Sequence, residues 1–182
     1  MASQRVAAVE PPYPAEVQTA FDVLMRGAPP LLLFRTVAQN PRVLQRMMAG
    51  GLLDRGSISI RARELVILRT CARCGAGYEW GVHVATFAAA AHLTDEQVRA
   101  TVLGRADASC WSAAEQAMIA AVDALHARAT LGDAEYKALS GHYDEDQILE
   151  IMLLCGFYRT VSYLANGLAL PLEEKAARFP AR

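Results

Sequence analysis

The stretch RELVILRTCARCGAGYEWGVH, residues 63–83, decides the fold. Its first half places apolar side chains at helical spacing, as at Leu65 and Leu68, and the glycines of CGAG interrupt that pattern. A second apolar helix is expected to begin near Tyr78 and to fold back against the first. The same helical spacing recurs outward in both directions, and no segment shows the strict alternation of a half-buried strand. We therefore predict an all-α protein.

Helix boundaries outside this stretch carry capping signals. A Ser, Thr or Asp followed three residues later by Glu or Gln is typical of a capping box, and the sequence contains it at Thr94 with Gln97, Ser112 with Glu115, and Asp144 with Gln147. Asp133 is expected to cap a further short helix. No low-complexity linker or abrupt change of composition divides the chain. We predict one domain, residues 1–182, of about seven to eight helices, with its motif core at 57–103.

The composition excludes several classes of function. Of the 182 residues, 53% are hydrophobic and 20% are charged, a balance that excludes a disordered chain. The 18 Lys and Arg residues against 19 Asp and Glu give a net charge of −1, so the molecule lacks the positive field that holds nucleic acid or an anionic membrane. Charged residues end the apolar runs before the roughly 20 residues that cross a bilayer, and the first residues lack a secretory signal. We expect a cytoplasmic protein with no nucleic-acid partner and no membrane segment.

The first candidate for chemistry is the pair of Glu79 and His83. The two residues are four positions apart, so on a helix they lie on one face within hydrogen-bonding reach. A carboxylate beside an imidazole makes a general acid or base that holds a proton near neutral pH. The same spacing is also typical of a solvated or interhelical pair. The flanking Tyr78 and Trp80, in a segment otherwise small and apolar, favour the functional interpretation because polar groups placed there need partners.

The second candidate is the C-x-x-C pair of Cys71 and Cys74. Redox dithiols of this pattern occur at the start of a helix, where the thiol pKa is lowered. Here the pair falls at the end of a predicted helix, where the dipole disfavours a thiolate. Four cysteines are too sparse for a disulfide framework, and no histidine at ligand spacing completes a metal site. Buried structural thiols are the main interpretation, and a redox-active dithiol is the alternative.

The last long helix, about residues 146–168, predicts assembly. Apolar residues cover most of its circumference, which argues for burial on more than one side. A second copy of the chain can provide that burial, so we predict a homo-oligomer whose contacts use this helix.

Several motifs of the chain resemble those of one family: RELVILR at 63–69, CGAGYEWGVH at 74–83, HLTDEQV at 92–98 and, later, FYRTVSYLANGLALPL at 157–172. They are similar to the carboxymuconolactone decarboxylase family, within the alkylhydroperoxidase D-like (AhpD-like) superfamily, and the likeness extends over most of the chain after residue 40. The resemblance implies an all-helical AhpD-like fold that assembles as a trimer or hexamer, with sites near subunit contacts.

The resemblance separates two branches of that superfamily. The peroxidase branch carries a C-x-x-C-x-x-x-H element with a proton-relaying glutamate upstream. His83 matches its histidine, and Glu64, 19 residues earlier, matches its glutamate. The two cysteine positions fall on Ala76 and Glu79, so neither aligned position offers a thiol nucleophile. In this feature the chain resembles the decarboxylase branch, where a carboxylate replaces the second cysteine.

The decarboxylase branch implies a lyase without a metal or organic cofactor, acting on a small carboxylated lactone or related organic acid by general acid–base proton transfer. We assign proton transfer to His83, its orientation to Glu79 and a supporting relay to Glu64. The weaker candidates for the substrate-binding wall are Tyr78, Trp80, Arg159 and Asn166. Two alternatives stay open: a thiol peroxidase or disulfide reductase using the C-x-x-C pair, and a non-catalytic oligomeric ligand-binding protein.

Overall fold

The computed structural model describes residues 4–181, and within this range the chain forms helices and no strand. The prediction of an all-α fold is confirmed. The helices are α1 (Ala15–Met25), α2 (Leu32–Val37), α3 (Pro41–Gly50), α4 (Ile60–Arg73), α5 (Gly77–Phe87), α6 (Asp95–Leu103), α7 (Ala113–Arg128), α8 (Asp133–Ser140) and α9 (Glu145–Gly167). These nine helices of the described range exceed the expected seven to eight, because even the short α2 and α8, of 6 and 8 residues, complete helical turns.

The predicted capping boxes set three of these boundaries. Side chains of the cap residue and of the third helical residue exchange hydrogen bonds with the backbone at the starts of α6, α7 and α9, where the caps are Thr94, Ser112 and Asp144. The expectation for α8 is wrong by one position. Its cap is Gly132, whose N–H donates to Glu135 at 2.8 Å, and Asp133 is the first helical residue.

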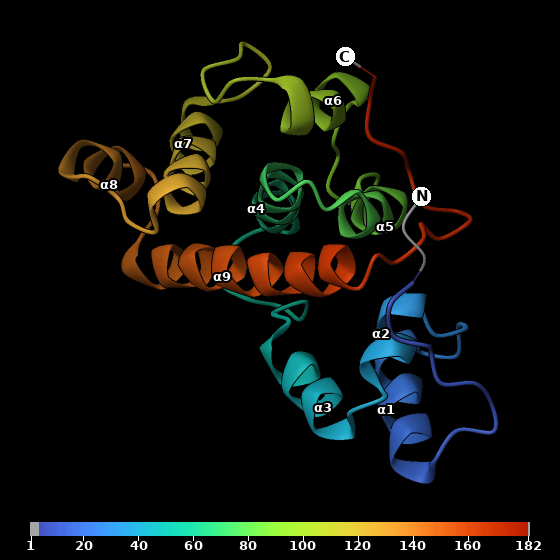
Figure 1. The fold of residues 1–182 in the computed structure, drawn as a ribbon. Coiled ribbons are helices and arrows are strands. Elements are labelled where there is room, and N and C mark those ends of the chain that lie inside the picture. Colours follow the sequence, from blue (N-terminus) through green and yellow to red (C-terminus); the bar gives the residue numbers. More distant parts are fainter. Residues whose placement is uncertain (1–3, 182) are drawn as a thin grey trace.

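Helix α4 lies at the centre of the molecule, with α5, α6, α7 and α9 packed around it (Figure 1). Four consecutive residues, Leu65 to Leu68, are buried to 0% exposure, so this helix is enclosed on every side. The polar residues in the middle of α4, such as Glu64 at 0% and Arg69 at 1% exposure, therefore cannot reach bulk water and must find partners inside the protein. This placement makes α4 the element from which the internal charge clusters are built.

Helix α9 is long and apolar enough, by length and composition alone, to cross a membrane. Its inner face, including Ile151, Leu154 and Tyr158, is buried against the other helices, which accounts for much of that apolar character. Its outer face leaves Leu149 66% and Leu153 56% exposed. The helix is therefore a core helix with one uncovered apolar stripe.

Helices α1, α2 and α3 lie on the opposite side of α9 from α4 in Figure 1. The C-terminal segment connects α2 to α5: Glu173 accepts a 2.6 Å hydrogen bond from the N–H of Leu32 and a second bond from the hydroxyl of Tyr78. Ala177 donates its N–H to the carbonyl of Gly81 at 3.1 Å. The segment thereby fixes α2 relative to α5.

Candidate active site

Glu64, Glu79 and His83 converge on one imidazole ring. Oε2 of Glu64, on α4, lies 2.8 Å from Nδ1 of His83. Oε1 of Glu79, one turn before His83 on α5, lies 3.3 Å from Nε2. The second oxygen of Glu64 accepts a 3.0 Å hydrogen bond from Nε of Arg63, whose guanidinium lies over the ring of Phe87. The sequence predicted the Glu79–His83 contact from spacing and the Glu64 contact from family resemblance, and the structure brings all three residues together.

The turn between α4 and α5 makes this convergence possible. Gly75 has φ +64°, a left-handed conformation that suits glycine, and it reverses the chain at the end of α4. Gly81 allows the C-terminal segment to approach α5, because a side chain there would lie 2.2 Å from the carbonyl oxygen of Ala177. Gly75 thus turns α5 back toward α4, and Gly81 leaves room for the C-terminal segment against α5.

Burial and charge together determine the protonation of His83. The residue is 3% exposed, and burial alone would lower the pKa of its imidazole. The hydrogen bonds to Glu64 and Glu79 outweigh burial and raise the pKa of His83 to about 9. At neutral pH the ring is therefore an imidazolium. With the guanidinium of Arg63, it places two cationic groups beside the two acidic side chains.

A pocket of about 650 Å³ adjoins His83 and Glu79. Helices α5 and α9 form one wall, and α1 to α3 with the loop after α3 form the other. The wall away from the charge cluster is made almost entirely of apolar side chains: Leu24, Met25, Phe34, Met47, Met48, Leu52 and Leu53. One oxygen of Glu79, Oε2, is buried and has no hydrogen-bond partner within residues 4–181. The pocket therefore combines an apolar interior with a carboxylate whose second oxygen is free to accept a hydrogen bond.

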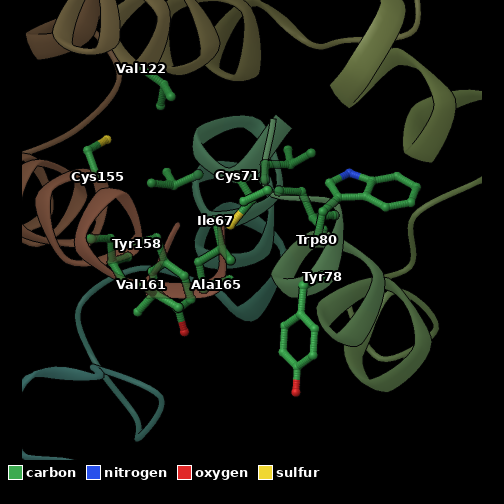
Figure 2. Packing of buried hydrophobic residues seen from close by; sticks show 14 of the residues in the cluster. Ile67, Cys71, Tyr78, Trp80, Val122, Cys155, Tyr158, Val161 and Ala165 are labelled. Carbon is green, nitrogen blue, oxygen red and sulfur yellow. The ribbon is translucent and has the colours of Figure 1, made fainter. Parts of the chain in front are cut away.

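The structure does not bring the expected wall residues to this pocket. Neither Tyr78 nor Trp80 lines it, and the two side chains project from α5 in different directions (Figure 2). The Tyr78 hydroxyl donates to Glu173, and the Trp80 indole donates to the hydroxyl of Thr101 at 3.0 Å. Both residues are used in packing, because only one face of α5 can face the pocket.

Arg159 and Asn166 also lie elsewhere. Arg159 donates to the carbonyl of His126 at 2.9 Å and to the hydroxyl of Tyr163 at 2.7 Å. The amide of Asn166 donates to the carbonyl of Cys74 at 2.9 Å. The prediction that these residues form the substrate-binding wall is corrected by this geometry, since their register on α9 turns them away from His83.

The cysteines are free thiols, and the C-x-x-C pair does not line the His83 pocket. Cys71 is 0% exposed, and burial raises the pKa of its thiol well above the usual value, with the charge of Glu79 adding to the effect. Its side chain lies in the core near Ile67 (Figure 2). Cys74, at the end of α4, is half-buried, and its Sγ lies 3.7 Å from Nδ1 of His126. Burial is thus confirmed for Cys71 and only partial for Cys74.

Sequence reasoning missed Arg63, Phe87 and Tyr158. Tyr158 lines the pocket and meets the His83 ring edge-on at 5.1 Å, and Phe87 lies 5.3 Å from the same ring. The position of Tyr158 in the FYRTV segment of the later motif could have indicated its role at the site. The position of Arg63, a charged residue beside Glu64 in an apolar helix, was a weaker indication. Phe87 has no signal, because it resembles any other apolar residue of α5.

The chain is similar in sequence to one protein family and in fold to several solved structures. Residues 39–123 match the model of the carboxymuconolactone decarboxylase family. No match was found among curated proteins. An uncharacterized peroxidase-related protein from Silicibacter sp. TM1040 is 19% identical with a TM-score of 0.81, covering 97% of this chain and 96% of that chain.

Two further solved structures are similar. The debrominase Bmp8, in complex with 2,3,4-tribromopyrrole, is 16% identical with a TM-score of 0.77 over 96% of this chain and 94% of its own. A protein of unknown function from Agrobacterium tumefaciens, a putative antioxidant defence protein AhpD, is 19% identical with a TM-score of 0.66 over 75% of this chain and 94% of its own. At these identities the likeness shows the fold, which is the AhpD-like helical fold.

The fold and the family match agree. Residues 39–123 are similar to the carboxymuconolactone decarboxylase family, and the helical fold of the chain is the AhpD-like fold.

Proposed function

We propose that this protein is a cofactor-independent lyase or isomerase of the carboxymuconolactone decarboxylase type, acting by proton transfer on a small lactone or a related carbonyl compound. One observation carries the proposal: a buried imidazolium lies between two carboxylates at the wall of a large pocket. Such an arrangement holds a proton in a dry site and can give it up or take it back.

Each residue of the cluster has its own role in the proposed proton transfer. Glu64, fixed by Arg63, orients His83 through Nδ1, so that Nε2 is directed at Glu79. Glu79 has a free oxygen, and it exchanges a proton between His83 and the substrate. Tyr158 stays neutral because burial raises its pKa, and its hydroxyl can donate to a substrate carbonyl. In this scheme Glu79 is a proton carrier rather than only the orienting group that its spacing suggested.

The reaction needs no external oxidant or reductant. In an isomerisation, the base takes a proton from the carbon next to the carbonyl, the electron pair of that C–H bond moves into the carbonyl, and the acid returns a proton to the same or a conjugated carbon. In a decarboxylation, the C–C bond to the leaving CO₂ breaks instead, its electron pair enters the same conjugated system, and His83 supplies the proton through Glu79. Both reactions use the same acid–base pair.

The thiol alternative has less support. Cys71 is enclosed in the core and its raised pKa disfavours the thiolate, so a peroxide would need to reach the half-buried Cys74 first. The S–N contact of Cys74 with His126 is the observation that keeps this alternative open. Treatment with peroxide followed by thiol titration tests it: loss of two thiols per chain together with peroxide turnover would support the redox function.

We also propose that the protein works as a homo-oligomer in the cytoplasm. The exposed stripe of α9 at Leu149, Leu153 and Tyr163 provides an apolar surface that a second copy can cover. Substitutions on the inner face, such as Leu154→Asp, would unfold the chain because Leu154 is 0% exposed. Leu153→Asp tests the assembly instead, and sedimentation should show a smaller particle with unchanged helical content. A wild-type monomer would reject this part of the proposal.

Proton exchange tests the proposed activity without knowledge of the natural substrate. An unsaturated γ-lactone such as α-angelica lactone is incubated with the protein in D₂O, and deuterium incorporation next to the carbonyl is followed by NMR. We expect exchange catalysed by the wild type and lost in His83→Gln. Cys71→Ser with Cys74→Ser is the matched control, and it should retain exchange. Absence of exchange with any lactone would favour a non-catalytic ligand-binding protein.

A further inference from the structure

The charges around the pocket place a limit on what can occupy it. Among residues 4–181, the pocket lining contains the acidic Asp54 and Glu79 and no lysine or arginine. The nearby guanidinium of Arg63 is already engaged by Glu64 and by the carbonyl of Leu53, at 2.9 Å. The positive charge of His83 is likewise held between two carboxylates. A carboxylated ligand would therefore bring its charge close to Glu79 with no free cation to balance it.

The unpartnered oxygen of Glu79 indicates which polar group a ligand must carry. A buried acceptor without a donor destabilises the protein, and a ligand that donates to it removes that cost. Glu79 lines the pocket, and Oε2 has no partner within the described residues, so a molecule in the pocket can supply the missing donor. Hydrogen bonds to an ionised carboxylate are stronger than those between neutral groups.

The lining of the rest of the pocket favours a ligand that is mostly apolar. A volume of about 650 Å³ lies in the range of sites for drug-sized ligands and exceeds what a small lactone would fill. Met25, Met47 and Met48 line the α1–α3 side, and methionine adapts its shape to different apolar groups.

We propose that the pocket selects an uncharged, largely apolar molecule with a hydroxyl or N–H group that donates to Oε2 of Glu79, and that it rejects carboxylates. This inference rests on the isomerase form of the proposed function, because a pocket that rejects carboxylates would not admit the substrate of a decarboxylation. It names an uncharged substrate class in place of the carboxylated lactone that the family name implies. The recognition uses the same carboxylate as the proton transfer, so binding places the polar end of the substrate beside the acid–base pair.

Three ligands of matched size test the inference by isothermal titration calorimetry at pH 7: 4-butylphenol, butylbenzene and 4-butylbenzoate. We expect 4-butylphenol to bind tightest, butylbenzene about tenfold more weakly because it lacks the donor, and 4-butylbenzoate weakest. Glu79→Gln removes the negative charge, so it should weaken 4-butylphenol and strengthen 4-butylbenzoate. Thr86→Val is the matched control: Thr86 lines the same pocket, but its hydroxyl already donates to the carbonyl of Val82, so the order of the three ligands should persist.

The outcomes separate this inference from the proposed function. Equal or tighter binding of 4-butylbenzoate by the wild type overturns the inference, as does the absence of binding by all three ligands. The wild-type order is decisive even if Glu79→Gln does not fold. If lactone proton exchange persists while the predicted order fails, only the substrate class is wrong. If the order holds but no exchange occurs, the pocket binds such molecules and the proposed function fails.

Discussion

Two buried charge clusters extend from α4, and they differ in how completely their hydrogen bonds are satisfied. Near the C-terminal end of α4, Arg69 donates to both oxygens of Asp123 at 2.7 Å and to three backbone carbonyls, and Arg73 donates to the same carboxylate. Near the start of α4, the cluster of Glu64, His83 and Glu79 leaves one carboxylate oxygen without a partner and adjoins a pocket.

The comparison distinguishes a structural use of buried charge from a functional one. The Arg69–Asp123 cluster joins α4 to α7, and the same guanidinium satisfies carbonyls at the end of α6, so nothing is left over for a ligand. The His83 cluster is more deeply buried, and it keeps a carboxylate oxygen without a partner in a residue that lines a cavity. Burial of charge is common to both, and incomplete satisfaction beside a cavity is what marks the candidate active site.

The largest expected effect is on activity, at His83. His83→Gln keeps a polar side chain between the two carboxylates but cannot supply a proton, so lactone exchange should fall by about 10²- to 10⁴-fold. The NMR exchange assay measures this loss, and circular dichroism checks that the helices are retained. An exchange rate within a few-fold of wild type would remove His83 from the mechanism.

A large effect on stability is expected in the other cluster. Arg69→Met leaves Asp123 partly buried and removes the donors to the end of α6, so the free energy of unfolding should fall by about 3–5 kcal/mol. Urea unfolding measures the change. The exchange activity of the remaining folded protein should match wild type, whereas a selective loss of activity would show that the two clusters do not differ in the way proposed.

The pH dependence of stability and activity tests the His83 cluster directly. The pKa of His83 is raised from 6.5 to about 9 in the folded protein, so its contribution to stability is complete below about pH 6.5 and is lost as the pH rises through about 9. Activity that needs the imidazolium should decline as the pH rises through the same value of about 9, which is the upper pH limit of activity. In Glu64→Gln this limit should move toward neutral pH, because one of the two stabilising carboxylates is gone. An unchanged pH profile in Glu64→Gln would contradict the role given to Glu64.

The smallest effect is expected from the thiols. Replacing Cys71 and Cys74 by Ser places a hydroxyl in the core and should cost about 1–2 kcal/mol of stability, with lactone exchange unchanged. Urea unfolding and the exchange assay measure the two quantities. Loss of a peroxide-dependent turnover in the double variant would instead promote the thiol function.

Part of the site followed from the sequence. The four-residue spacing of Glu79 and His83 puts both on one face of a helix whatever surrounds that helix, and the contact is present. The partner on α4, Glu64, followed only from family resemblance, because spacing within a helix says nothing of contacts between helices. Tyr78 and Trp80 were placed at the pocket for their chemistry, yet their side chains pack toward the C-terminal segment and α6.

The helices and most of their ends could be predicted from the sequence, because apolar spacing and capping are properties of neighbouring residues. The positions of α1, α2 and α3, and therefore the large apolar pocket beside His83, could not be predicted in this way. Nor could it be predicted that Oε2 of Glu79 lacks a donor while the carboxylate of Asp123 is fully occupied. These facts depend on how helices far apart in the chain pack against each other, and that packing is set by side-chain shape over the whole core, which no local pattern records.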